Sequence, residues 1–76
     1  MISNIPIYLY PDTIDYLDKN TSIINLIEKD TSTKISIIKK KYDPYLMING
    51  YYENYHKARI ILYEIEKKRY GVKNKI

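Results

Sequence analysis

The sequence predicts an α+β protein in which three helices pack on one face of a three-stranded sheet, in the order strand, helix, helix, strand, strand, helix. Two segments, at residues 5–10 and 34–38, alternate their side chains with the period of two expected of strands. A third segment, at 52–69, repeats apolar residues at helical spacing. With 76 residues, the chain has room for one domain, which we place at 1–70 and which a basic tail follows at 71–76.

The first strand and the first helix meet at Pro11. Pro6 lacks a backbone N–H donor, so the strand at 5–10 should lie at an edge of the sheet. A short helix should follow it, with Asp12 or Thr13 as the N-cap, because these side chains can accept a hydrogen bond from the first turn.

The second helix follows a polar interruption at residues 18–21. Ile24 and Ile27 are three residues apart and therefore share one face of this helix. Thr21 is the residue we expect to cap its N-terminus. The apolar face predicts that this helix packs against the sheet.

The second half of the chain reads as two strands and one long helix. Residues 34–38 are rich in β-branched side chains, and a third strand runs through 45–48. We expect Gly50 to close that strand with a positive φ angle. The helix at 52–69 would be about 27 Å long, and Gly71 should end it.

Composition limits the possible functions. The chain has a net charge of +4, no cysteine, one histidine and no apolar run near the roughly 20 residues of a membrane span. We therefore expect no disulfide, no metal site, no cofactor, no small-molecule substrate and no membrane association. No secretory signal is evident, so we expect an intracellular protein, cytoplasmic or nuclear. No nucleotide-binding loop or catalytic signature is present, and an enzyme is not expected.

Ten tyrosines and no phenylalanine or tryptophan occur in the chain. We interpret this as the codon bias of an AT-rich genome, with tyrosine standing in the core where phenylalanine would otherwise lie. Because a buried tyrosine hydroxyl needs a partner, several rings should lie at the margin of the core. Stacking of nucleic-acid bases on these rings is the alternative.

Three segments, taken in order, resemble those of a K-homology (KH) domain of the eukaryotic type. Residues 17–27, L-D-K-N-T-S-I-I-N-L-I, resemble the stretch around I-G-x-x-G-x-x-I-x-x-I. Residues 31–37, T-S-T-K-I-S-I, resemble T-G-A-K-I-x-I, and 48–62 resemble the ending I-x-G, x-x-V-x-x-A-x-x-x-I. The resemblance implies a groove for single-stranded RNA or DNA beside the loop between the first two helices.

The chain departs from this pattern in that loop, where Asp18 and Thr21 replace both glycines. Side chains at these positions obstruct close approach of a phosphate backbone. Asp18 also adds a negative charge, about 1 kcal/mol of repulsion toward a phosphate at 4 Å in water, which Lys19 partly offsets. In this family, such a loss implies weak or absent binding in the groove.

The candidate nucleic-acid contacts are polar or basic side chains of the loop, the second strand with its exit, and the last helix. They are Lys19, Asn20, Lys34, Lys39, Lys40, Lys41, Lys67, Lys68 and Arg69. The run at 39–41 could instead protect an edge strand from aggregation. The basic cluster at 67–69, with Lys73 and Lys75, could instead compensate the helix dipole.

Two functions follow from this pattern. In the first, the chain is a small KH-like nucleic-acid-binding or ribonucleoprotein accessory protein, which contacts single-stranded RNA weakly through basic patches and gains avidity from a larger particle. In the second, a degenerate KH fold serves as a protein-interaction or scaffold module of a virus or parasite. A protein partner is expected in both.

Overall fold

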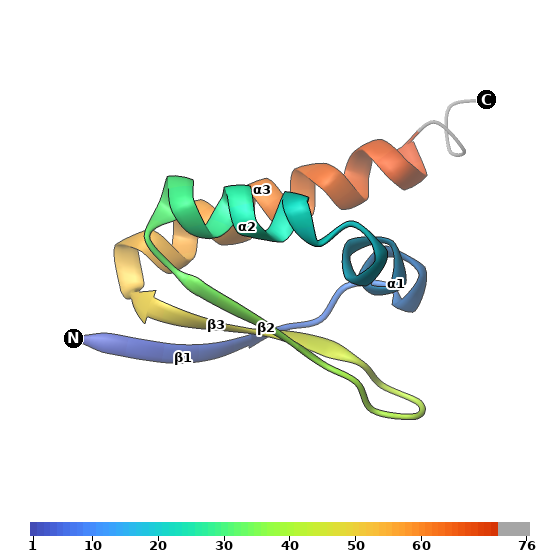
Figure 1. Ribbon diagram of the computed structural model, residues 1–76, viewed down its shortest axis with the longest axis horizontal. Coiled ribbons are helices and arrows are strands. Elements are labelled where there is room, and N and C mark those ends of the chain that lie inside the picture. Colours follow the sequence, from blue (N-terminus) through green and yellow to red (C-terminus); the bar gives the residue numbers. More distant parts are fainter. Residues whose placement is uncertain (72–76) are drawn as a thin grey trace.

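The computed structural model describes residues 1–71 and contains six elements (Figure 1). They are β1 (Ile2–Ile7), α1 (Pro11–Lys19), α2 (Thr21–Thr31), β2 (Lys34–Ile38), β3 (Tyr45–Tyr51) and α3 (Tyr52–Gly71). This confirms the predicted element order and the α+β class. No helix in the described part of the chain is both long and apolar enough to span a bilayer.

The sheet is antiparallel, with the strands in the order β1-β3-β2. Ile48 of β3 pairs with Ile5 on one side and with Ile35 on the other. The strand with the most buried apolar positions is therefore central, and Leu46 and Ile48 are fully buried. β1 lies at an edge, as Pro6 predicted.

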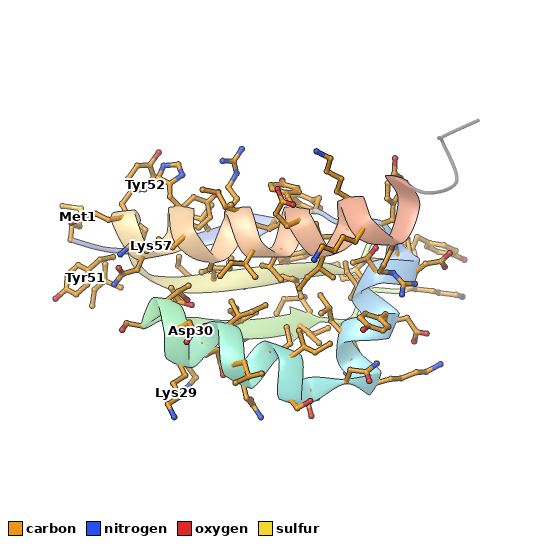
Figure 2. All side chains as sticks on the ribbon, turned by 90° about the horizontal axis from the view of Figure 1, so that it is seen from above. Met1, Lys29, Asp30, Tyr51, Tyr52 and Lys57 are labelled. Carbon is orange, nitrogen blue, oxygen red and sulfur yellow. The ribbon has the colours of Figure 1, made fainter. Side chains whose placement is uncertain are left out.

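The three helices cover one face of the sheet and leave the other face open (Figure 1). α2 and α3 lie side by side over the sheet when it is viewed from above (Figure 2). The core between these layers consists of one cluster of buried apolar side chains. Its members are Ile7, Leu9, Ile14, Leu17, Ile24, Ile27, Ile35, Leu46, Ile48, Tyr55, Ala58 and Leu62.

Both predicted helix caps are wrong. α1 begins at Pro11, and the N-cap is Tyr10, whose carbonyl accepts hydrogen bonds from the backbone N–H groups of Thr13 and Ile14 at 2.9 and 3.1 Å. Proline fits the first helical position because the N–H that it lacks has no partner there. Thr21 lies inside α2, whose N-cap is Asn20, and no side chain caps either helix.

Strand β1 begins three residues earlier than predicted because its partner is longer than predicted. β3 continues to Tyr51, and Ile2 pairs with that residue, so the ladder extends to Ile2. At the other end, β1 stops at Ile7, and residues 8–10 connect it to α1.

Gly50 does not have a positive φ angle and does not close β3. It lies within the strand and pairs with Ser3. A Cβ atom at this position would lie 3.1 Å from Cγ2 of Thr33, a buried residue whose hydroxyl contacts that of Thr31 at 2.8 Å. Glycine is thus favoured by the close approach of the segment that enters β2.

The last helix is two residues longer than predicted and ends at Gly71 rather than before it. Gly71, which we assigned to the basic tail, therefore belongs to α3. Lys73 and Lys75, which belong to the predicted C-terminal cluster, lie outside the described residues.

Candidate nucleic-acid interface

A groove of about 160 Å³ lies between α1 and the loop that joins β2 to β3. It is lined on one side by α1 and on the other by Ile37 at the end of β2 and by Lys39 and Pro44 of the loop. The α1 residues are Pro11, Ile14, Asp15 and Asp18. The groove therefore has an apolar floor, two carboxylates on one wall and a single lysine on the other.

The short link between α1 and α2 fixes the position of Asp18. Only Asn20 separates the two helices, and its side-chain amide donates a hydrogen bond to the carbonyl of Tyr16 at 2.7 Å. Its backbone carbonyl accepts a hydrogen bond from Ile23 at 3.0 Å. The predicted contact residue Asn20 thus joins the two helices, and both its side-chain amide and its carbonyl have partners within the chain.

An ion pair crosses the groove. Nζ of Lys39 lies 3.0 Å from Oδ2 of Asp18, and the Asp18 side chain is only 33% exposed. A second pair, between Lys19 and Asp15, spans one turn of α1 at 3.1 Å, with both side chains well exposed. Two of the predicted nucleic-acid-binding lysines therefore have their charge offset by a carboxylate of α1.

The other lysines of the second strand and its exit have a different environment. Lys40 lies over the ring of Tyr45 at 5.7 Å, and Lys41 lies over the ring of Tyr42 at 5.3 Å. Lys34 is exposed on β2. Within the described part of the chain, no carboxylate forms an ion pair with Lys34, Lys40 or Lys41, and their charges remain available to an anion.

The predicted basic cluster on α3 lies elsewhere, at the end of the helix that packs near α1. The guanidinium of Arg69 lies 4.4 Å from the ring centre of Tyr16, and its Nε is buried. Lys68 lines a hollow of about 280 Å³ with Tyr16, Ile23, Ile65 and Arg69. Arg69 is thus partly a packing residue, whereas Lys67 and Lys68 are exposed.

Two features of this surface were missed by reasoning from sequence. The ion pair between Asp18 and Lys39 joins α1 to the exit of β2, a contact that depends on the tertiary fold. The ring of Tyr8, which directly follows β1, lies 5.3 Å from that of Tyr45, the first residue of β3. The period of two at residues 5–10 already placed Tyr8 on the face opposite to that of the buried Ile7 and Leu9, so the exposure of this ring could have been predicted from the sequence.

Among the described residues, no three His, Asp or Glu side chains are grouped as metal ligands would be. Comparison of the chain with protein-family models, with curated proteins and with solved structures found no match. The proposals below therefore depend on the sequence pattern and on the arrangement of these side chains.

Proposed function

We propose that this chain is a small KH-like nucleic-acid-binding protein that acts as an accessory component of a ribonucleoprotein. It contacts single-stranded RNA through basic patches rather than through the loop between α1 and α2. The observation that carries this proposal is the set of three lysines, Lys34, Lys40 and Lys41, that have no carboxylate partner among the described residues. Unpaired lysines at both ends of β2 on a cationic chain attract a polyanion and release its counterions.

The position of the groove also supports a KH-like protein. It lies between the segment that resembles the G-x-x-G stretch and the lysine run at 39–41. The resemblance implies a nucleic-acid groove at this place. Here the carboxylates of Asp15 and Asp18 make the groove unfavourable for phosphate, so binding moves to the neighbouring lysines.

A salt titration tests this function. The full chain is titrated with single-stranded RNA and DNA at several salt concentrations, alongside the triple variant Lys39→Ala, Lys40→Ala, Lys41→Ala. We expect weak binding that falls steeply with salt and is lost in the variant, because phosphate contacts dominate such affinity. The matched control, Lys29→Ala with Lys57→Ala, removes two exposed lysines from the helices (Figure 2) and should bind normally. Absence of binding at low salt would overturn the proposal.

The second candidate is a protein-interaction module, and the ion pair across the groove favours it. The contact between Lys39 and Asp18 occupies the groove with the chain's own side chains. A fold that no longer admits a nucleic acid there is free to serve as a scaffold. This function predicts that the wild-type chain binds no RNA at low salt.

A further inference from the structure

The face of the sheet opposite the helices is uncovered (Figure 1). Side chains alternate between the two faces of a strand, and Leu46 and Ile48 point toward the helices. Tyr45, Met47, Asn49 and Tyr51 therefore point away from them.

Two tyrosines lie together at one end of this open face. The rings of Tyr8 and Tyr45 lie 5.3 Å apart with an angle of 40° between their planes, and Lys40 lies over Tyr45 at 5.7 Å. Tyr8 remains 57% exposed, so much of its ring is not used in packing within the chain. Tyr51 is 53% exposed at the other end of β3, about 20 Å along the strand. Exposed rings at both ends can each accept a stacked base.

The acidic residues of the molecule lie away from the strands. None of the three strands contains Asp or Glu. Eight of the nine acidic residues lie on the helices, and the ninth, Asp43, lies in the loop between β2 and β3. Lys34 and Lys40 carry positive charge at the open face without an ion-pair partner in residues 1–71. The face therefore favours a polyanion.

The middle of the face has two rows, one with Met47 between Pro6 and Ser36 and one that is entirely polar. Asn49 pairs with Asn4 on one side and with Lys34 on the other, so two amides and an ammonium form one row across the sheet. An apolar protein surface docked here would desolvate these groups without partners, at considerable cost. A hydrated single strand would instead leave them solvated or use them as hydrogen-bond donors and acceptors to base edges.

We propose that the open face of the sheet binds single-stranded nucleic acid, with bases stacked on Tyr8 and Tyr45 and with Lys34 and Lys40 at the phosphates. This inference depends on the proposed function and names the surface that performs it, which is distinct from the groove. A duplex does not fit this mode of binding, because its bases are already stacked on one another.

Substitution of the two rings tests the assignment. Tyr8→Leu and Tyr45→Leu are titrated with a single-stranded oligouridylate about 15 nucleotides long, within the usual range of site sizes. Each should weaken binding about tenfold. Tyr63→Leu is the matched control, because Arg59 lies over that ring at 5.2 Å on the helical side, and it should bind like the wild type.

A second measurement remains valid if a leucine variant folds poorly. The chain has no tryptophan, so Tyr8→Trp supplies a single indole that still stacks. Its fluorescence should be quenched by the oligouridylate, whereas that of Tyr63→Trp should not change. Unquenched Tyr8→Trp, or leucine variants that bind normally, would overturn the stacking surface while the proposed function stands.

If the wild-type chain binds no oligonucleotide at low salt, both the surface and the proposed function are overturned. If it then captures an acidic protein and loses it on Lys34→Ala with Lys40→Ala, the face serves a protein partner instead. A duplex that binds as tightly as the single strand would also overturn the inference.

Discussion

At the scale of single residues, Asp18 sets the charge of the groove. Its carboxylate lies in the last turn of α1, at a position where the proposed likeness to a KH domain would place a glycine. It contacts the first lysine of the run at 39–41 rather than leaving that charge for a ligand. If the groove is a nucleic-acid site as we propose, this one residue occupies space for a phosphate backbone and pairs with one of the cations that would attract it.

The variant Asp18→Asn tests this account. The substitution removes one negative charge and releases Lys39 to act with Lys40 and Lys41. We expect single-stranded RNA to bind about fivefold more tightly at low salt, from about 1 kcal/mol of relieved repulsion. Stability should change by less than about 1 kcal/mol, because an ion pair whose lysine is largely exposed contributes little.

Asp30→Asn is the matched control for this substitution. Asp30 is an exposed carboxylate at the end of α2 that lies away from α1 (Figure 2). Its loss makes the same change in net charge at a distance from the lysine run. Equal gains in the two variants would mean that net charge alone controls binding, and no gain in Asp18→Asn would contradict a role for Asp18.

Single residues also show where sequence reasoning fails. The partner of Lys39 could not be predicted, because Asp18 comes close to it only after α1 packs beside the exit of β2. The role of Gly50 was misread for a related reason. Its small size accommodates Thr33, a neighbour in space, whereas the sequence indicated only a turn.

At the scale of elements, the apolar pattern predicted which helices and strands occur better than it predicted where each begins and ends. Both boundaries of β2 were predicted correctly, because its alternation at 34–38 is bounded by polar residues on each side. β1 was displaced, since pairing with β3 decides where an edge strand begins. The N-termini of α1 and α2 were misplaced because their N-caps, Tyr10 and Asn20, make no side-chain capping hydrogen bond. The N-terminus of α3 was predicted correctly at Tyr52.

One carboxylate joins α3 to the start of α1. Oε2 of Glu66 accepts a hydrogen bond from the backbone N–H of Tyr10 at 2.7 Å. We expect Glu66→Ala to lower the free energy of unfolding by about 1 kcal/mol, because a charge-assisted hydrogen bond between two elements is lost. Glu66→Gln should lower the free energy of unfolding by less, because its side-chain amide oxygen can still accept the hydrogen bond from Tyr10.

Urea denaturation of the wild type, Glu66→Ala and Glu66→Gln measures this effect. The urea concentration at the midpoint of unfolding should shift, while the dependence of the unfolding free energy on urea stays constant. Glu64→Ala is the control, because that side chain is exposed on the same helix. If Glu64→Ala and Glu66→Ala shift the midpoint equally, the effect comes from α3 itself and not from its bond to Tyr10.

At the scale of the whole molecule, the fold keeps the acidic residues off the sheet, whereas basic residues lie both on the helices and near the sheet. Acidic residues occur throughout the chain, yet the strands contain none, so folding leaves an acid-free sheet face opposite the helices. This property becomes visible in the sequence once the strands have been assigned. The position of Lys40 over Tyr45, in contrast, required the structure.

This separation predicts which lysines determine the salt dependence of binding. For single strands, the logarithm of affinity falls with the logarithm of salt by about 0.7 per neutralised phosphate. If Lys34, Lys40 and Lys41 each neutralise one phosphate, their joint replacement by alanine should flatten the slope by about 2. Replacement of Lys29 and Lys57, which lie on the helical side, should leave the slope unchanged although two positive charges are removed. Fluorescence titrations of the full chain from low to moderate salt measure both slopes. Equal flattening in the two variants would mean that the polyanion senses only net charge, and the two sides of the molecule would then be electrostatically equivalent.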